Sequence, residues 1–360
     1  MRIAIILGTR PEIIKMSPVI RKCERKCLDY FILHTGQHYS FEMDKIFFED
    51  LGLPDPKYNL DVGSGSHAEQ TGKIMAGVER VLIENKPGVV LVQGDTNTVM
   101  AGALVASKLH IDVGHVEAGL RSYDKRMPEE INRLVTDHIS DYLFAPTEIS
   151  KKNLLKEGIS EEKINVTGNT IVDAVYQNLE IAKKKFDFLQ DLGLKPKDYF
   201  LATIHRAENV DDPRRLGEIL EGLKQVATEF SMTVIFPIHP RTKKMVREFG
   251  FELDGIRVIE PVGFLEFLQL EAGAKLALTD SGGVQEETCI LGVPCVTLRD
   301  NTERPETIRV GSNVLAEAKA ESMLRCVRLM KNQNNKWDNP FGDGTSGECI
   351  VKHIISFKPE

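Results

Sequence analysis

The chain has 360 residues, 42% of them hydrophobic and 28% charged, and it carries a formal net charge of −7. This length predicts about two domains, each large enough to bury a hydrophobic core of its own. The acidic balance excludes a general nucleic-acid-binding protein, because such binding needs an excess of Lys and Arg, and no apolar run is long enough to span a membrane.

Short apolar runs alternate with longer amphipathic segments in the first half of the chain. We expect strands at residues 2–7, 30–34, 88–92, 112–116 and 141–145. The segments between them have helical length and periodicity, as at 68–84 and 98–109. Strands that alternate with helices are typical of a parallel sheet with helices on both faces.

The second half of the chain repeats this pattern. Strands are expected at residues 199–203, 233–236, 256–259, 275–278 and 295–298. We therefore predict the α/β fold class, with two doubly wound parallel-sheet (Rossmann-like) domains facing a cleft. The first domain is expected at 1–170 and the second at 171–345, and a short helix within 346–360 should cross back to the first domain.

Ligands of such sheets bind at the carboxyl ends of the strands, so polar residues should gather in the loops there. After the first predicted strand, Arg10 and Lys15 are placed to pair with a phosphate group. A turn with solvated charges is the alternative. After the second predicted strand comes a polar loop with Gln37 and His38, which offers a further substrate contact.

Three acidic residues, Asp95, Glu117 and Glu129, fall on one rim of the first predicted sheet. Asp95 and Glu129 also have plainer interpretations, because an Asp at that place caps the next helix and an acidic residue in a first turn complements the helix dipole. Of Glu129 and its neighbour Glu130, one is expected to do only that. Converging carboxylates repel one another, so at least one should have a raised pKa and serve as an acid or base.

The segment 276–287 predicts a buried strand, a glycine turn and a helix N-terminus. Free backbone N–H groups and the helix dipole make such a junction an anion site, where Gly282 and Gly283 admit a phosphate closely and Ser281 adds a hydroxyl. An ordinary glycine turn is the alternative.

Two histidines, His205 and His239, follow successive strands of the second predicted sheet. This placement makes them better site candidates than His67, His110 or His353, which are expected to face solvent or to pack.

The sequence contains no Walker A motif and no cysteine–histidine spacing for zinc, and its GxGxxG match at 342–347 does not follow a predicted strand. This argues against NAD, ATP hydrolysis and a structural metal, so we expect neither a cofactor nor a metal, and the chemistry must come from side chains. The six cysteines include no CxxC pair and predict reduced, mostly buried thiols in a cytoplasmic protein.

Seven motifs occur along the chain in one order: GTRPE at 8–12, QGDT at 93–96, HVEAGLRS at 115–122, PEEINR at 128–133, HRAEN at 205–209, DSGGVQEE at 280–287 and TERPE at 302–306. With these motifs the chain resembles the non-hydrolysing UDP-N-acetylglucosamine 2-epimerases over nearly its whole length. The resemblance implies the two-domain GT-B architecture, with the C-terminal helix returning to the first domain.

The resemblance implies reversible epimerisation of UDP-N-acetylglucosamine (UDP-GlcNAc) to UDP-N-acetylmannosamine (UDP-ManNAc) at C2. UDP is eliminated to give a 2-acetamidoglucal and then adds back to the other face. Four alternatives stay open: an epimerase of a UDP-2-acetamido sugar modified at C3 or C6, a hydrolysing 2-epimerase, a GT-B glycosyltransferase and a non-catalytic nucleotide-sugar sensor. Relatives are commonly dimers, so a homodimer is expected, with a UDP-sugar as its small-molecule partner.

The resemblance also implies roles for individual residues. Asp95, Glu117 and Glu129 would be the catalytic carboxylates, with the C2 base among them left open, and His205 would assist departure of the phosphate. The resemblance implies a diphosphate site formed by Arg10, Lys15, Ser281, Gly282 and Gly283, a ribose contact from Glu287 and a uracil contact from Phe267, which is expected in a loop. The sugar would be contacted by Arg206 and His239, and the cleft would be lined by Arg304. An activating second UDP-GlcNAc would be bound by Gln37 and His38.

Overall fold

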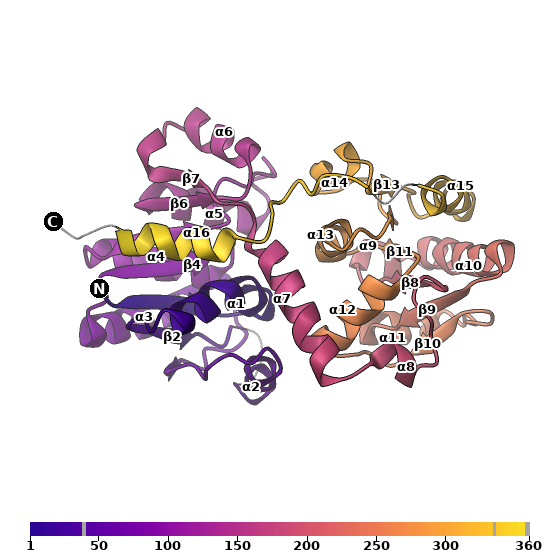
Figure 1. The fold of residues 1–360 in the computed structure, drawn as a ribbon, viewed down its shortest axis with the longest axis horizontal. Coiled ribbons are helices and arrows are strands. Elements are labelled where there is room, and N and C mark those ends of the chain that lie inside the picture. Colours follow the sequence, from indigo (N-terminus) through magenta and orange to yellow (C-terminus); the bar gives the residue numbers. More distant parts are fainter. Residues whose placement is uncertain (38–40, 334–335, 357–360) are drawn as a thin grey trace. The chain divides into compact units, whose positions relative to one another are not determined.

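The computed structural model describes residues 1–37, 41–333 and 336–356. The chain folds into two compact units (Figure 1). Unit 1 contains Met1–Gln177 and the chain from Phe341 onward, and unit 2 contains Asn178–Pro340. Helix α7 (Thr170–Lys185) runs through the boundary between the two units.

Unit 1 is built on a seven-stranded sheet in the order β3-β2-β1-β4-β5-β6-β7, and its described strand pairings are all parallel. The strands are β1 (Ile3–Leu7), β2 (Tyr30–His34), β3 (Tyr58–Asn59), β4 (Val89–Gln93), β5 (Asp112–Val116), β6 (Tyr142–Ala145) and β7 (Ile164–Val166). Every residue of β1 and β4 is buried, as expected for central strands with helices on both faces.

The helices of unit 1, besides the first part of α7, are α1 (Arg10–Arg25), α2 (Phe41–Asp50), α3 (His67–Asn85), α4 (Asn97–Lys108), α5 (Pro128–Ile139), α6 (Glu148–Lys156) and α16 (Ser346–Ser356), with a 3₁₀ turn at Glu161–Lys163. α3 begins with a capping box, in which the Ser66 hydroxyl accepts from the Glu69 N–H and the Glu69 carboxylate accepts from the Ser66 N–H. α16, yellow in Figure 1, packs on α1.

The start of α16 is held by Asp173, a buried residue of α7. Its carboxylate accepts hydrogen bonds from the backbone N–H groups of Ser346 at 3.1 Å and Gly347 at 3.0 Å. Two first-turn N–H groups of the last helix are thereby satisfied by a side chain far earlier in the sequence.

Unit 2 is built on a six-stranded parallel sheet in the order β10-β9-β8-β11-β12-β13. Its strands are β8 (Tyr199–Thr203), β9 (Thr233–Pro237), β10 (Arg257–Ile259), β11 (Leu276–Thr279), β12 (Cys295–Thr297) and β13 (Asn313–Leu315). Its helices are α8 (Phe188–Asp191), α9 (Ala207–Val210), α10 (Pro213–Phe230), α11 (Pro240–Glu248), α12 (Phe264–Gly273), α13 (Gly282–Ile290), α14 (Pro305–Arg309) and α15 (Ala320–Lys331).

The predicted fold class is confirmed, because both sheets are parallel and helices alternate with their strands. In each sheet the strand order reverses once, between β1 and β4 in unit 1 and between β8 and β11 in unit 2. Such a reversal leaves a crevice at the carboxyl ends of the two central strands, where ligands of α/β sheets bind. The loops after these four strands are therefore the places to look for a site.

Two further expectations can be compared with the structure. The six cysteines are free thiols, and four of them are buried: Cys23, Cys289, Cys295 and Cys326. Every helix in the described parts of the chain is too short or too polar to span a lipid bilayer.

Candidate active site

In unit 1, the loop after β1 approaches the start of α4 very closely at Gly8. A β-carbon on Gly8 would lie 2.1 Å from Thr98 Oγ1 and 2.4 Å from Thr35 Oγ1, so only glycine fits. Glu12, in the first turn of α1, accepts hydrogen bonds from the Gly8 N–H and from the Thr96 hydroxyl, each at 2.6 Å. Its carboxyl group therefore links the loop after β1 to the loop after β4.

Glu12 is 2% exposed, and its burial raises the pKa of its carboxyl group from 4.5 to about 7, with a smaller contribution from the nearby Asp95 charge. Hydrogen bonds from Thr96 and Gly8 oppose this rise without cancelling it. A carboxyl group with a raised pKa thus lies on this rim, but it is not one of the three carboxylates for which the rise was expected. It belongs to a residue that the sequence analysis did not select, although it stands in the GTRPE motif.

Glu117 follows β5 directly and is buried, with 7% of its surface exposed. Its carboxylate contacts Lys15 Nζ at 2.6 Å and Asn169 Nδ2 at 3.3 Å, and it also accepts a short hydrogen bond from Gln93 Nε2. Lys15, which we expected to meet a phosphate, is therefore paired with a carboxylate in this structure.

The backbone of Glu117 is in the left-handed region, with a φ of 72°. For a residue with a side chain this conformation costs about 1–2 kcal/mol, and such strain is concentrated at functional sites. The strained turn and the three donors together fix where the Glu117 carboxylate lies.

Asp95 and Glu130, the second of the two glutamates that begin α5, share one arginine as a neighbour. Arg133 bonds the Asp95 carboxylate through Nη2 and the Glu130 carboxylate through Nη1 at 3.0 Å. Glu130 is buried and also accepts from the Ser122 N–H and hydroxyl, whereas Glu129 is exposed. Glu130 is thus the member of the pair that stabilises local structure, and Glu129 is the member left on the surface.

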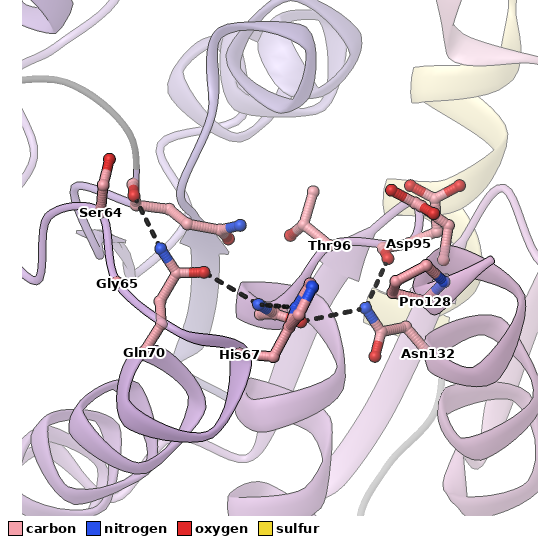
Figure 2. Close-up of a pocket in the computed structure, with 11 residues that line it drawn as sticks. Ser64, Gly65, His67, Gln70, Asp95, Thr96, Pro128 and Asn132 are labelled. Carbon is pink, nitrogen blue, oxygen red and sulfur yellow. Dashed lines mark hydrogen bonds between the residues drawn. The ribbon is translucent and has the colours of Figure 1, made fainter. Parts of the chain in front are cut away.

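A cavity of about 310 Å³ lies beside these residues and is lined by Asp95 and Glu129, together with Gln37, Ser64, Gly65, His67, Gln70, Thr96, Asn97, Pro128 and Asn132 (Figure 2). Gln70, Asn97 and Asn132 form a chain of side-chain amides along it, which ends on the backbone carbonyl of Asp95 at 2.9 Å. The cavity brings Asp95 and Glu129 together; Glu117 is not one of its lining residues.

The loop after β2 contributes Gln37 to this cavity. Gln37 is buried, and its side-chain oxygen accepts from the Thr98 hydroxyl at 2.7 Å and from the Thr98 N–H at 3.2 Å. Its predicted neighbour in a second site, His38, lies outside the described residues.

The three histidines that were set aside differ in their surroundings. His110 is exposed, and His353 packs against the rings of Tyr142 and Phe144, as expected. His67 is exposed too, but it lines the cavity and its Nδ1 lies 3.2 Å from the side-chain amide of Asn97. Sequence reasoning missed this position because His67 begins a helix rather than following a strand.

A buried histidine supports the turn that presents Asp95. His115 faces the Gly94 carbonyl through Nε2 at 2.8 Å and the Asp137 carboxylate through Nδ1 at 2.6 Å. Asp137 also pairs with Arg121 at 2.7 Å. Burial would raise the pKa of Asp137, but the charges and hydrogen bonds of His115 and Arg121 outweigh it and lower the pKa. Gly94, with a φ of 88°, is therefore held at its carbonyl just before Asp95.

In unit 2, His205 follows β8 and pairs with Asp280, which follows β11. The His205 Nδ1 lies 3.1 Å from Asp280 Oδ1, and the same carboxylate accepts from the backbone N–H groups of His205 and Arg206 and from the Asn209 amide. Burial opposes ionisation of Asp280, but these donors keep its pKa below the usual value. Because Nδ1 is used by Asp280, Nε2 is the ring nitrogen left for a ligand.

The His239 ring lies 5.7 Å from the His205 ring, measured between centroids, so the structure brings these two candidates together. Burial and the neighbouring His205 lower the pKa of His239. Arg206, next along the chain, lies 3.7 Å from the Glu303 carboxylate.

The loop after β11 gives the predicted helix N-terminus. Ser281 is the N-cap of α13, where its hydroxyl accepts from the Val284 N–H at 3.5 Å, and Gly282 and Gly283 form the first turn. Arg304 meets Glu286 of the same helix at 2.7 Å. Glu287, further along α13, is half-buried.

Phe267 does not lie in a loop, so that prediction is wrong. It is part of α12 and packs, half-buried, against the core cluster that includes Tyr199 and Leu270. The run from Phe264 has apolar residues at helical spacing, which extends the helix through this position.

Arg10, at the start of α1, is half-buried, and its guanidinium group lies 5.3 Å from the centroid of the Phe47 ring. Such stacking on an aromatic face orients the arginine side chain.

Comparison with known proteins places these features in one family. The family model for UDP-N-acetylglucosamine 2-epimerase matches residues 21–355. A UDP-N-acetylglucosamine 2-epimerase of Methanocaldococcus jannaschii is 61% identical over 98% of this chain and 98% of that protein. A UDP-2,3-diacetamido-2,3-dideoxy-D-glucuronate 2-epimerase of Pseudomonas aeruginosa is 43% identical over 98% of this chain and 99% of that protein.

The solved structures agree. A crystal structure of the M. jannaschii UDP-GlcNAc 2-epimerase in complex with UDP-GlcNAc and UDP matches with a TM-score of 0.87 and 60% identity, over 99% of this chain and 100% of that one. The chain therefore belongs to the UDP-N-acetylglucosamine 2-epimerase family of isomerases, as its motifs predicted.

Proposed function

We propose that this protein interconverts UDP-GlcNAc and UDP-ManNAc by inversion at C2, without net hydrolysis. The observation that carries the proposal is the full-length match, at 61% identity, to a protein named UDP-N-acetylglucosamine 2-epimerase. Polar residues at both points of strand reversal support it, because this is where α/β sheets bind ligands.

In the proposed mechanism, a carboxylate removes the C2 proton as the bond to UDP breaks, which gives 2-acetamidoglucal and UDP. A proton then returns to C2 on the other face as UDP adds back, so atoms and charge balance over the cycle. The acid–base groups are assigned to Asp95, Glu117 and Glu129. Glu12 supports the assignment of acid–base chemistry to this rim of the sheet. Its carboxyl group has a pKa of about 7, and it accepts a hydrogen bond from Thr96, the residue after Asp95.

The leaving UDP needs groups that stabilise its developing negative charge. We assign this role to His205, to the N-terminus of α13 at Ser281, Gly282 and Gly283, and to Arg10. Asp280 would keep Nδ1 of His205 protonated and so direct Nε2 to the phosphate.

The remaining ligand contacts are proposals as well. Glu287 is assigned to the ribose hydroxyls, Phe267 to the uracil region, Arg206 and His239 to the sugar end, and Arg304 to the ligand-facing surface of unit 2. Lys15 is assigned to orienting the Glu117 carboxylate as well as to the diphosphate, because the two side chains are 2.6 Å apart.

A second candidate substrate is a UDP-2-acetamido sugar altered at C3 and C6. The relative named UDP-2,3-diacetamido-2,3-dideoxy-D-glucuronate 2-epimerase favours it, at 43% identity. Its C2 chemistry would be the same, so only contacts to the sugar substituents would differ.

Proton NMR of the purified protein with UDP-GlcNAc in deuterated water tests the proposal. Formation of UDP-ManNAc with deuterium at C2 of both sugars is the expected result. Release of free ManNAc and UDP would instead identify a hydrolysing enzyme. No change at C2, with exchange in the C3- and C6-modified sugar, would establish the second candidate; no exchange in either would reject the epimerase proposal.

A further inference from the structure

Glu271 is a fully buried acidic residue that the proposed mechanism does not use. It belongs to α12, and neither of its carboxyl oxygens is bonded by a donor among the residues that the structure describes. An ionised carboxylate in such a place would lose its hydration with nothing to replace it. A neighbouring group must therefore explain how the Glu271 carboxyl group is accommodated in the interior.

The group beside it is the carboxyl of Glu287, which the Glu271 side chain contacts at hydrogen-bonding range. The other titratable groups near Glu271 are Tyr199 on β8 and Cys295 on β12. The Tyr199 hydroxyl donates to the Leu270 carbonyl, and the Cys295 thiol lies 4.0 Å from the Thr297 hydroxyl. No lysine or arginine pairs with Glu271 within the described chain.

Two carboxylates cannot remain in contact in a buried place without a proton between them. Burial and then the Glu287 charge raise the pKa of Glu271 well above its usual value. Glu271 is the fully buried member of the pair and Glu287 is half-buried, so the proton resides on Glu271. The contact is then an O–H···O bond in which Glu271 donates and Glu287 accepts.

We propose that Glu271 is a positioning residue, a protonated acid whose hydrogen bond orients the Glu287 carboxylate to receive the two ribose hydroxyls of a uridine nucleotide. This rests on the proposed function, which assigns the ribose to Glu287. A carboxylate on a helix can adopt several rotamers, and a donor behind it selects one before the ligand arrives. The hydrogen bond also leaves Glu287 ionised, so it can accept from both hydroxyls.

The proposal is tested with two substitutions of similar size. Glu271→Gln keeps a donor that cannot lose a proton, and Glu271→Met keeps the volume but has no donor. The measured quantity is the ratio of dissociation constants for 2′,3′-dideoxy-UDP and UDP, obtained by calorimetry on the full chain. This ratio isolates the ribose hydroxyls, because the diphosphate and uracil are the same in both ligands.

E271M should reduce the ratio about tenfold, as expected for loss of one hydrogen bond to a charged group, while E271Q should keep it within about twofold of the wild-type value. Circular dichroism confirms that both variants are folded. If folded E271M keeps the wild-type ratio, the positioning role is wrong.

Infrared spectroscopy provides an independent measurement, which also applies if E271M does not fold. The wild-type-minus-E271Q difference spectrum at pH 8.5, where Glu12 with its pKa of about 7 is ionised, should show the carbonyl band of a protonated carboxylic acid. A wild-type spectrum identical to that of E271Q would overturn the proposal. Glu287→Gln distinguishes failure of the proposed function from failure of the positioning role. If E287Q leaves the ratio unchanged, the assignment of the ribose to Glu287 fails. If the ratio falls in E287Q but not in E271M, only the role of Glu271 is rejected.

Discussion

The Thr96 hydroxyl donates to the Glu12 carboxyl group at 2.6 Å, across the point where the strand order of the first sheet reverses. In the second sheet Asp280, which follows β11, is linked to the loop after β8, because its carboxylate accepts a hydrogen bond from the backbone N–H of His205. In both units a buried carboxyl group joins the loops after the two central strands. The pKa of each of these carboxyl groups is shifted from its usual value, so the contribution of each to stability depends on pH.

Glu12→Gln should make the stability of unit 1 less dependent on pH. The pKa of Glu12 rises from 4.5 to about 7 on folding, so the folded state keeps a proton that the unfolded state loses. Wild-type stability relative to E12Q is therefore full below pH 4.5 and falls as pH rises to 7, by about 3 kcal/mol in total. Urea unfolding of both proteins at pH 5 and pH 8 measures this difference.

Glu49→Gln is the matched control, because that side chain is 63% exposed and pairs only loosely with Lys45, at 3.8 Å. Its stability should follow that of the wild type at both pH values. Parallel pH dependence of E12Q and the wild type would contradict the assignment of a near-neutral pKa to Glu12.

Asp280→Asn should destabilise unit 2 and reduce turnover. Four donors face this carboxylate: the N–H groups of His205 and Arg206, the Asn209 amide and His205 Nδ1. An amide cannot accept from all of them, because its nitrogen is itself a donor. We expect a loss of about 2–3 kcal/mol in unfolding free energy and of about 100-fold in kcat. Because the pKa of Asp280 is lowered on folding, this stabilisation is present above pH 3.8 and is lost as pH falls below it.

Asp300→Asn provides the comparison for this prediction, since Asp300 is 63% exposed and meets Arg215 at 3.1 Å at the surface. Surface pairs contribute little, so both Tm and kcat should stay near wild-type values. Equal effects of D280N and D300N on kcat would show that His205 does not depend on Asp280.

Glu129→Gln and Glu130→Gln should separate function from stability at neighbouring positions. Glu130 is buried and accepts from Ser122, Tyr123 and Arg133, so E130Q should lower Tm by several degrees. Glu129 is exposed beside the cavity, so E129Q should leave Tm unchanged and reduce kcat about 100-fold. Thermal unfolding and turnover assays on both variants decide this, and a reversed pattern would exchange the two roles.

Glu117→Gln should remove turnover while leaving UDP binding within about threefold of the wild-type affinity. The amide fills the same volume but cannot serve as a base, and loss of one acid–base group lowers kcat by about 10²- to 10⁴-fold. Initial rates and UDP titration calorimetry give the two quantities. Unchanged turnover with weakened UDP binding would make Glu117 a structural partner of Lys15.

The central strands were predictable because each is a short, continuous apolar run, as in β1 and β4. Three strands escaped prediction: β3, β7 and β13 have two or three residues each and lie at or near the edges of their sheets. A run this short carries no periodicity, so sequence alone distinguishes it from a loop only in some cases, as it did for β10 and β12.

The loops of the site were also predictable, since polar residues follow apolar strands. The importance of Glu12 was not, because its burial depends on Thr96, which is distant in sequence and close only after β1 and β4 pair. Glu271 was hidden for a related reason: within an amphipathic helix an acidic residue looks solvent-facing until α13 packs beside it.

The bonds from Asp173 to the N–H groups of Ser346 and Gly347 have a consequence for synthesis of the protein. The residues of unit 2 all leave the ribosome before α16 does, so unit 2 can fold as a continuous piece of nascent chain. Unit 1 must wait, with the buried Asp173 carboxylate and the apolar side of α1 uncovered, until its last helix arrives. Truncation before α16 would therefore leave an incomplete unit 1, a natural target for chaperones and proteases, beside a finished unit 2.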